Sequence, residues 1–386
     1  MCDPFACTTM RIGLDARYTT DHFPGIGRYT LSLAEALAGL GSDHTLVLIV
    51  DPRAQRGRYD LAGLGALPGV ELAEAPVAPF SVAQHLALPI LARRLRLDVL
   101  HSPYYIKPYL GLPCPSVVTI YDLIGWRFPR ALSWRGRLFY RVSMALAART
   151  ATGIITISES ARTDIAHVYR LSPRRIAVTP LAANRRFQPQ APEAVAAARR
   201  RYGLPERYVL YVGSNKPHKN LERLARAWRK VLEEAHEASA GAALVIAGHE
   251  DPRYSEVRRF VAEHALEARV RFAPNVAEAD LPALYSGATV FAFPSYYEGF
   301  GLPPLEAMAC GAPVLCAYAS SLPEVVGDAA LTVDPFNVNE LAEGLARLLG
   351  NPVLRRALSE RGRQRAGLFS WRRTALQTLR VYESLR

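Results

Sequence analysis

Several features that would assign the chain to other protein classes are missing from the sequence. Its five cysteines are odd in number and form no C-x-x-C pair, which argues against a disulfide scaffold and against a structural zinc site. No run reaches the roughly 18 apolar residues of a membrane-spanning helix. No zinc finger or RRM signature occurs, so nucleic acid is not an expected partner. These absences favour a globular protein with reduced thiols.

The amino end also lacks the features of a secretory signal. The first ten residues, MCDPFACTTM, contain neither a basic segment nor an apolar core. An apolar strand pattern begins at Met10, so we expect residues 1–9 to be a disordered lead or the result of an upstream start. The expected location is therefore the cytoplasm.

What the chain has is length, apolar residues and positive charge. Its 386 residues exceed the size of one ordinary core, so we expect two domains. Half of the residues are hydrophobic, which is sufficient for globular folding. The formal net charge is +12. A solvated arginine-rich surface, an anionic membrane partner or a polyphosphate ligand would each account for this surplus.

The amino-terminal half alternates short apolar strands with helices. The first strand is expected at Met10–Asp15 and the first helix at Leu31–Leu40. The alternation continues as far as Val178, which predicts a doubly wound parallel sheet. Such sheets bind ligands beyond the carboxyl ends of their strands.

Two candidate sites follow strands of this half. The segment FPGIGRY places Gly25 and Gly27 in a loop before the first helix, where glycines either admit a ligand to the backbone or form a turn. Asp122 directly follows the strand expected at Val117–Tyr121. Its carboxylate is a candidate catalytic group, and equally a group that caps or orders its own loop.

A polar, proline-containing segment at 181–192 is the expected linker. A second series of strands and helices follows it, with a long helix expected over Leu221–Ala238. We therefore expect an N-terminal Rossmann-like domain at 10–180 and a C-terminal one at 193–365. The helical end, 366–386, is expected to cross back to the N-terminal domain.

The stretch 290–318, VFAFPSYYEGFGLPPLEAMACGAPVLCAY, carries the most chemistry. It is a strand, a glycine loop, two prolines, a helix expected from Leu305, and a second strand. Glu298 lies in the loop and Glu306 in the helix. N–H groups at a helix N-terminus suit phosphate, and carboxylates accept hydrogen bonds from sugar hydroxyls. The pattern indicates a site for a phosphorylated, hydroxyl-rich ligand.

A basic loop follows the strand expected at Tyr208–Val212. Its sequence, GSNKPHKN, places Lys216, His218 and Lys219 just before a helix. A lysine ammonium there suits a diphosphate, and helix N–H groups would take the remaining oxygens. The spacing of a Walker loop is absent. The alternative is a solvated basic loop without a ligand.

Together these segments resemble the retaining glycosyltransferases of family 4, over nearly the whole chain. SYYEGFGLPPLEAMACGAPVLC at 295–316 resembles the family's signature with two glutamates, and LYVGSNKPHKNL at 210–221 resembles its diphosphate loop. GIGRY, LHSPYY, TISES and SSLPEVVGDAALTVDP resemble further segments of the family. The resemblance implies an α/β GT-B fold, in which two Rossmann-like doubly wound parallel-sheet domains face each other across a cleft.

The resemblance also implies roles for individual residues. Glu298 would face the hydroxyls of the donor sugar, and Lys219 would neutralise the leaving diphosphate. Asp122 would lie on the acceptor side and complete the catalytic set. Glu306 would accept hydrogen bonds from the donor's ribose. The other implied donor-binding residues are Gly25, Gly27, Gly213, Ser214, Lys216, His218, Asn275, Val276, Phe300, Gly301 and Leu302.

The sequence departs from the family pattern at two positions. An arginine often stands beside the diphosphate lysine, whereas here Ser214 follows the glycine and His218 precedes the lysine, with Lys216 as the candidate replacement. Tyr121 stands where many members have a histidine before the acceptor-side acid, so a histidine-dependent role is not expected there. The resemblance implies no metal or other cofactor, and no cluster has metal-ligand spacing.

The implied reaction is transfer of a hexose from a nucleotide-diphosphate sugar to a saccharide or lipid-linked acceptor, with retention of anomeric configuration. The loop Gly-Phe-Gly-Leu-Pro-Pro looks like that of bacterial mannosyl- and rhamnosyltransferases of surface polysaccharide synthesis. GDP-mannose is therefore the first candidate donor and a UDP-sugar the second.

The segment Trp126–Arg149 interleaves aromatic side chains with arginines. It predicts contact with an anionic membrane or a lipid-diphosphate acceptor, and a peripheral position on the inner face of the cell membrane. The alternative is an ordinary helix with an aromatic core face and solvated arginines.

Two other classes of function compete with the transferase. One is a GT-B enzyme of another reaction type, a sugar-nucleotide epimerase or a phosphorylase, and the pairing of Glu298 with Glu306 argues against it. The other is a non-catalytic binder of sugar nucleotides or polyanions, and the presence of Glu298, Glu306 and Lys219 argues against that. Turnover of the donor without an acceptor would favour the epimerase.

Overall fold

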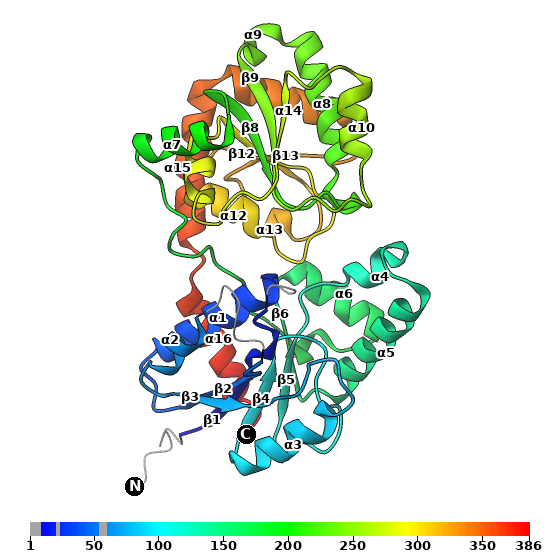
Figure 1. Cartoon of the computed structure of the whole chain (residues 1–386), viewed down its shortest axis with the longest axis vertical. Helices are drawn as coiled ribbons and strands as arrows, with labels where there is room; N and C mark the ends of the chain where they lie inside the picture. Colours follow the sequence, from blue (N-terminus) through cyan, green and yellow to red (C-terminus); the bar gives the residue numbers. More distant parts are fainter. Residues whose placement is uncertain (1–8, 21–23, 54–59) are drawn as a thin grey trace. The chain divides into compact units, whose positions relative to one another are not determined.

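The computed structural model describes residues 9–20, 24–53 and 60–386 (Figure 1). The lead expected at residues 1–9 lies outside this part of the chain, apart from Thr9. The chain divides into two compact units. One unit comprises the chain up to Leu181 together with Ser370–Arg386. The other comprises Ala182–Phe369. We call them the N-terminal and the C-terminal unit.

The N-terminal unit contains a seven-stranded sheet in the order β3-β2-β1-β4-β5-β6-β7. Every neighbouring pair is parallel, and the order reverses between β1 and β4, so the sheet is doubly wound as the strand–helix alternation predicts. Its strands are β1 (Arg11–Asp15), β2 (Thr45–Val50), β3 (Val70–Glu74), β4 (Val99–Ser102), β5 (Ser116–Thr119), β6 (Gly153–Thr156) and β7 (Ile176–Val178).

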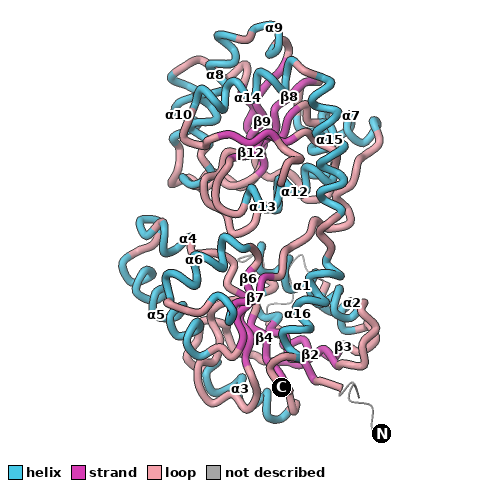
Figure 2. Tube along the Cα trace, turned by 180° about the vertical axis from the view of Figure 1, so that it is seen from behind, coloured by secondary structure: helices cyan, strands magenta, loops and turns pink. Residues whose placement is uncertain are grey.

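The helices of this unit surround the sheet. They are α1 (Pro24–Ala38), α2 (Leu61–Gly65), α3 (Gln84–Arg94), α4 (Ile124–Arg127), α5 (Trp134–Thr150), α6 (Glu159–Tyr169) and, from the end of the chain, α16 (Trp371–Glu383). Figure 2 shows α1 and α16 side by side.

The prediction of a glycine loop before the first helix is wrong. The helix begins at Pro24, so Gly25 and Gly27 lie in its first turn. The reason is local: proline is favoured at the first helical position because its fixed φ suits a helix and its missing N–H would be unsatisfied there anyway. A Cβ at Gly25 would meet no atom within 4 Å, so its immediate surroundings would accept a side chain.

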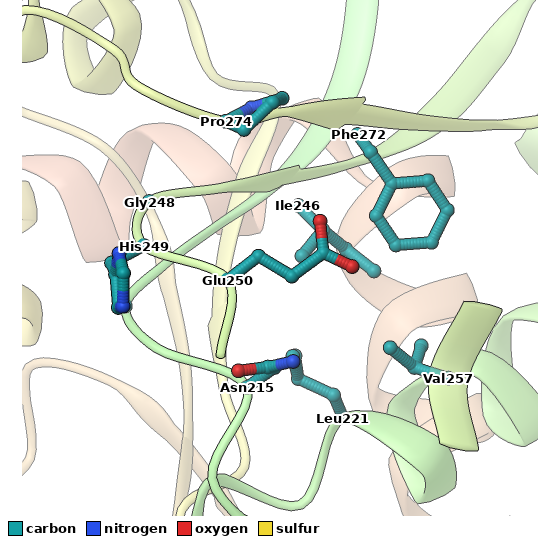
Figure 3. A pocket seen from close by; sticks show the side chains of 10 residues that line it. Asn215, Leu221, Ile246, Gly248, His249, Glu250, Val257, Phe272 and Pro274 are labelled. Atoms are coloured by element: carbon teal, nitrogen blue, oxygen red, sulfur yellow. The ribbon is translucent and has the colours of Figure 1, made fainter. Parts of the chain in front are cut away.

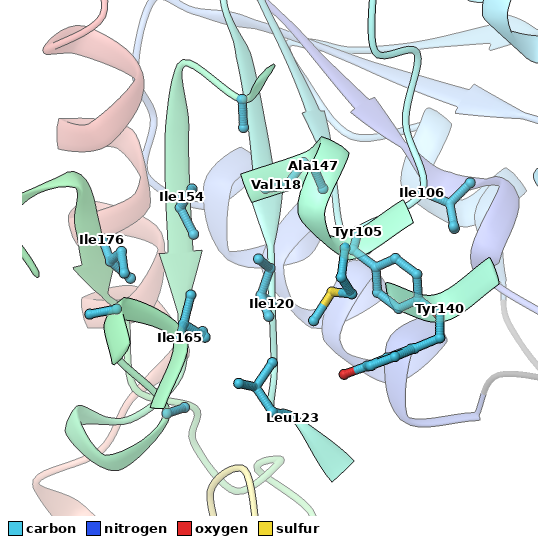
Figure 4. Packing of buried hydrophobic residues seen from close by; sticks show 14 of the residues in the cluster. Tyr105, Ile106, Val118, Ile120, Leu123, Tyr140, Ala147, Ile154, Ile165 and Ile176 are labelled. Carbon is cyan, nitrogen blue, oxygen red and sulfur yellow. The ribbon is translucent and has the colours of Figure 1, made fainter. Parts of the chain in front are cut away.

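One apolar cluster packs α5 and α6 against the sheet (Figure 4). Val118, Ile120 and Ile154 on the strand side meet Ala147 of α5 and Ile165 of α6, all nearly inaccessible to solvent. Strands buried on both faces need continuous apolar runs, which explains why these segments do not alternate polar with apolar residues.

A hydrogen-bonded chain of polar groups fixes α16 to this sheet. His101 of β4 is fully buried, with its Nδ1 2.6 Å from the Tyr382 hydroxyl of α16 and its Nε2 2.8 Å from Thr119 Oγ1 of β5. The Tyr29 hydroxyl of α1 lies 3.1 Å from the same Thr119 oxygen. Burial lowers the pKa of His101 to about 3. The imidazole is therefore neutral at pH 7, with one ring nitrogen donating and the other accepting.

The C-terminal unit contains a six-stranded parallel sheet in the order β10-β9-β8-β11-β12-β13. Its strands are β8 (Arg207–Val212), β9 (Ala242–Ala247), β10 (Val270–Ala273), β11 (Val290–Phe293), β12 (Val314–Ala317) and β13 (Leu331–Val333). Its helices are α7 (Pro192–Tyr202), α8 (Leu221–Glu234), α9 (His236–Ser239), α10 (Glu256–Glu263), α11 (Leu281–Gly287), α12 (Leu302–Ala309), α13 (Leu322–Val326), α14 (Val338–Gly350) and α15 (Pro352–Gly367).

Two helices of this unit differ from the prediction. The helix expected over Leu221–Ala238 is interrupted at Ala235, where α8 ends and α9 begins. The helix expected from Leu305 begins earlier, at Leu302, with Pro303 and Pro304 in its first turn. Prolines are tolerated there because the first N–H groups of a helix have no partner within it.

The buried histidine predicts how stability depends on pH. His101 has a pKa of about 3 in the folded chain and about 6.5 when unfolded, so the unfolded state binds the extra proton between these values. The contribution of His101 to the free energy of unfolding should be complete above about pH 6.5 and should fall by up to about 1.4 kcal/mol per pH unit towards pH 3.

Urea unfolding from pH 4 to 7.5 measures this dependence. His101→Gln should show a shallower loss of stability on acidification than the unaltered chain. The exposed His167 of α6, changed to glutamine, is the matched control and should retain the original slope. Equal slopes for His101→Gln and the unaltered chain would contradict the prediction.

Candidate functional site

Three neighbouring strands of the C-terminal unit end around one pocket (Figure 3). Gly213 follows β8, Gly248 follows β9 and Pro274 follows β10. Gly248 has φ +118°, and a Cβ there would lie 2.4 Å from the carbonyl oxygen of Gly213, so this contact requires glycine. The pocket therefore lies at the carboxyl edge of a parallel sheet, where this architecture binds ligands.

The side chain of Asn215 ties two loops of this edge together. Its Nδ2 donates to the carbonyl oxygens of Asp251, at 2.9 Å, and Tyr254, at 2.6 Å. Its Oδ1 accepts from the backbone N–H of Asp251 at 2.7 Å. Because a single amide makes three hydrogen bonds, the basic loop after β8 and the loop after β9 are held in one arrangement.

The basic loop presents one lysine to an acidic partner. Lys219 Nζ lies 2.6 Å from Glu298 Oε1, and both side chains are mostly buried, at 16% and 11% exposed. The ammonium also lies 5.5 Å from the centre of the Phe293 ring. The structure thus brings together two of the predicted catalytic residues, from sequence positions 79 apart. Lys216, in contrast, is exposed and has no ion-pair partner among the described residues.

His218 holds loops together through its backbone. Its carbonyl oxygen accepts from Ser295 Oγ and from the N–H of Tyr296, both at 3.0 Å. Its side chain is buried, and burial together with the charges of Lys219 and Lys216 lowers the pKa of His218 to about 4. The imidazole therefore supplies no positive charge at pH 7, and it cannot replace an arginine as a cation.

The N-terminus of α12 offers few hydrogen-bond donors because two of its first residues are prolines. In the described chain, the N–H groups of Phe300, Gly301 and Leu302 donate to no protein acceptor. Gly301 has φ +121°, and a Cβ there would lie 2.7 Å from Leu322 Cδ2, so only glycine fits. The predicted glycine loop thus leaves three consecutive N–H groups without a protein acceptor in the described part of the chain, an arrangement that suits an anion.

Two serines from the segment after β12 fix the position of this loop. Ser321 Oγ lies 2.6 Å from the Phe300 carbonyl oxygen and 3.0 Å from that of Glu298. Ser320 Oγ lies 2.8 Å from the Glu298 carbonyl oxygen and 3.3 Å from the Glu298 nitrogen, whose N–H donates to it. The serines thereby orient the backbone that carries both the Glu298 carboxylate and the row of N–H groups.

Glu306 lies on α12 and is only 4% exposed. Its Oε2 accepts a hydrogen bond from the Tyr285 hydroxyl of α11 at 3.2 Å. Burial, followed by the nearby charge of Glu306, raises the pKa of Cys310 to about 12, so that thiol is neutral. The two glutamates thus have different surroundings: Glu298 pairs with a cation and Glu306 with a phenol.

Other predicted donor residues lie in loops that follow strands of the same sheet. Ser214 accepts at its carbonyl oxygen from the Tyr211 hydroxyl, at 2.8 Å. Asn275, exposed and with φ +62°, directly follows Pro274 of the pocket, and Val276 is half-buried beside it. In the described part of the chain, no hydrogen bond or ion pair joins Asn275 or Val276 to Lys219 or Glu298.

In the N-terminal unit, Asp122 follows β5 and is half-buried. Its Oδ1 accepts the N–H of Ile124 at 2.8 Å, so the carboxylate orders the start of α4, as one of its two sequence interpretations predicts. Nearby tyrosines, including Tyr105 and Tyr140, have raised pKa values. Burial is the main cause, and the charge of Asp122 adds to it. Asp122 thus lies in a tyrosine-lined part of this unit.

Sequence reasoning missed the residues that position the others. Asn215, Ser295, Ser320 and Ser321 carry no charge, and all four donate to backbone oxygens far away in the sequence. Their only signal is their place within three of the segments that resemble the family. Among the described residues, no group of three or more His, Cys, Asp or Glu side chains is arranged to hold a metal ion.

Comparison with known families matches both halves of the chain. Residues 24–186 match Glycosyltransferase Family 4, and residues 196–365 match the glycosyl transferases group 1. The chain is 34% identical over 288 residues to the O-antigen chain mannosyltransferase B of Escherichia coli, covering 74% of each chain. It is 28% identical to the MMP alpha-(1->4)-mannosyltransferase of Mycolicibacterium hassiacum, covering 97% of this chain and 98% of that one.

Solved structures share the two-domain fold. The sucrose-phosphate synthase of Thermosynechococcus elongatus superposes with a TM-score of 0.75 at 24% identity, covering 97% of this chain and 99% of the other. The Anabaena protein Alr3699/HepE, in complex with UDP and glucose, superposes with a TM-score of 0.73 at 20% identity, covering 97% of this chain and all of the other. Both support the GT-B assignment of the two parallel-sheet units.

The serine anchors predict a separable effect on ligand binding. Ser321→Ala leaves two carbonyl oxygens without this donor, which should cost about 1–3 kcal/mol and loosen the loop that carries Glu298. Ser359→Ala is the matched control, since Ser359 donates to the Gly311 carbonyl oxygen at the other end of α12.

Both variants should lower the melting temperature, but only Ser321→Ala should weaken binding of a nucleotide sugar in calorimetry. Equal losses of affinity in the two variants would show that the serine does not act on the loop's position.

Proposed function

This chain belongs to glycosyltransferase family 4, and from that premise we propose that it transfers mannose from GDP-mannose to a saccharide or lipid-linked acceptor with retention of anomeric configuration. A UDP-sugar is the second candidate donor. The observation that carries the proposal is the Lys219–Glu298 ion pair next to the N–H groups of Phe300, Gly301 and Leu302. A cation, a carboxylate and N–H donors on one edge of the sheet support the binding of a diphosphate sugar.

The proposed division of labour follows from the charges. Lys219 and the row of N–H groups bind the diphosphate, which gains negative charge as the bond to the sugar breaks. Glu298 then exchanges its lysine partner for hydroxyls of the transferred sugar. Glu306, buried beside Tyr285, accepts hydrogen bonds from the ribose hydroxyls.

The proposed reaction exchanges one bond at the anomeric carbon for another on the same face of the sugar. The C–O bond to the diphosphate breaks, and a bond to the acceptor hydroxyl oxygen forms. The hydroxyl proton passes to the departing phosphate oxygen, which acts as the base. Fixed cationic and N–H groups stabilise the departing charge without reorganisation, which is the largest contribution that enzymes commonly make. No step requires a metal or another cofactor.

The choice of mannose rests on relatives, whose names describe mannosyltransferases in Escherichia coli and Mycolicibacterium hassiacum. The alternative rests on a more distant structure, which contains UDP and glucose. On the acceptor side we propose Asp122, whose carboxylate is half-buried among tyrosines and would orient or polarise the incoming hydroxyl.

A panel of GDP-, UDP- and dTDP-sugars tests the donor. A ligand that binds only the folded chain at 100 times its Kd stabilises it by about 2.7 kcal/mol, or roughly 5–10 °C for a unit of this size. GDP-mannose should give the largest shift in a thermal denaturation assay. A larger shift with a UDP-sugar would replace the donor, and no shift with any member would contradict the proposed function.

Two lysines of one loop test the catalytic role. Lys219→Gln should lower kcat by about 100-fold or more, because a charge-stabilising donor is lost where the leaving group departs. The exposed Lys216, changed to glutamine in the same loop, should lower kcat less than about tenfold. Steady-state kinetics with a fixed acceptor measures both, and a Glu298→Ala variant with full activity would remove this pair from the mechanism.

A further inference from the structure

The outer face of α5 exposes apolar side chains in a regular row. Trp134, Leu138, Val142 and Leu146 recur every four residues, and the first three are half exposed or more. The opposite face of the helix packs into the apolar cluster of the sheet. Helical spacing of four residues places the row along one side of the helix, so these side chains form a single outward stripe.

A second row lies on and just before α3, in the same unit. Val82, Leu86 and Ile90 also recur every four residues, and they are 86%, 73% and 64% exposed. The segment that leads into α3 meets α5 at Phe80, whose ring centre lies 6.2 Å from that of Phe139, with both residues partly exposed. We call the two rows together the α3–α5 surface.

The chain around this surface is strongly basic. Between residues 75 and 158 there are ten lysine and arginine residues but only two acidic ones, Asp98 and Asp122. This segment thus carries eight of the chain's twelve net positive charges. Arg130, Arg135, Arg137, Arg141 and Arg149 are all exposed, and none of them has an ion-pair partner in the described part of the chain.

Two of these arginines are placed by aromatic rings. The Arg135 guanidinium lies 5.1 Å from the centre of the Trp134 ring, and that of Arg141 lies 4.6 Å from the centre of the Trp126 ring. The stacking orients positive charge beside the apolar rows at little entropic cost. Tryptophan with arginine is a combination that suits the boundary between lipid headgroups and acyl chains.

We propose that the α3–α5 surface binds the headgroup layer of an anionic lipid bilayer, with the apolar rows inserted and the arginines contacting lipid phosphates. None of the helices within the described ranges is long and apolar enough to cross a bilayer. Binding is therefore peripheral, through amphipathic helices that lie in the plane of the membrane. The proposal rests on the proposed function only in expecting an acceptor that is carried on a lipid.

Charge favours a bilayer over the other occupants of such a surface. A second copy of the chain joined by two-fold symmetry would place the same unpaired arginines against each other, and like charges at an interface are repulsive. Nucleic acid would satisfy the arginines, but its groove edges and phosphates offer nothing to seven exposed aliphatic and tryptophan side chains. Anionic lipid satisfies both the charge and the apolar rows.

Vesicle co-sedimentation tests the proposal without donor or acceptor, so its outcome is independent of catalytic activity. The full chain should bind vesicles of phosphatidylcholine with 30% phosphatidylglycerol. It should bind vesicles of pure phosphatidylcholine much less. Arg135→Gln, Arg137→Gln and Arg141→Gln together should lower the partition coefficient by about 100-fold, from about one kcal/mol per charge. Leu138→Ser with Leu86→Ser should also weaken binding, and salt should weaken it further.

Matched controls lie in the C-terminal unit. Arg200, Arg259 and Arg356, changed to glutamine, remove the same charge from other exposed positions, and Val353→Ser with Leu368→Ser removes two other exposed apolar side chains. Both sets should bind as the unaltered chain does. Equal effects of the control and test sets, or equal binding to neutral and anionic vesicles, would overturn the proposal. So would concentration-dependent dimers in sedimentation velocity that Leu138→Ser abolishes, without vesicle binding.

Discussion

The ion pair between Lys219 and Glu298 is the interaction on which the candidate site depends. Without a ligand, each charge is partnered by the other in a setting that excludes most water. A buried pair of this kind gains little net stability, because desolvation offsets much of the attraction, whereas removal of either partner is costly. Its value is that both groups are held ready. An incoming phosphate can take the ammonium and a sugar hydroxyl can take the carboxylate, so neither charge is left unpaired during exchange.

The large elements of the fold follow from the sequence, because apolar runs of strand length alternate with helical periods. The parallel sheets are predicted on that ground, and the structure contains them. Local backbone chemistry caused the errors: Pro24 begins α1 earlier than the apolar period suggests, and Leu302 begins α12 ahead of its two prolines. In both cases the first turn of the helix contains proline, which that turn accepts.

The site was predictable only where its residues carry charge. Lys219 and Glu298 stand out in their segments, and their contact follows once both lie at strand ends of one sheet. The positioning groups do not stand out, because Ser321 and Asn215 act on carbonyl oxygens, which every residue has. The exposed row on α3 was also unpredicted: apolar residues at helical spacing normally indicate a buried face, and only the packing of the helix shows which side faces outwards.

The position of α16 has a consequence for synthesis on the ribosome. The last helix supplies Tyr382, the hydroxyl partner of the deeply buried His101 in the unit that is made first. That unit cannot complete its core until Ser370–Arg386 have been synthesised, whereas the C-terminal unit, Ala182–Phe369, is contiguous and is made before them. The usual order, in which the domain nearest the amino end matures first, is therefore reversed here. Until then the buried His101 of the N-terminal sheet lacks its hydroxyl partner.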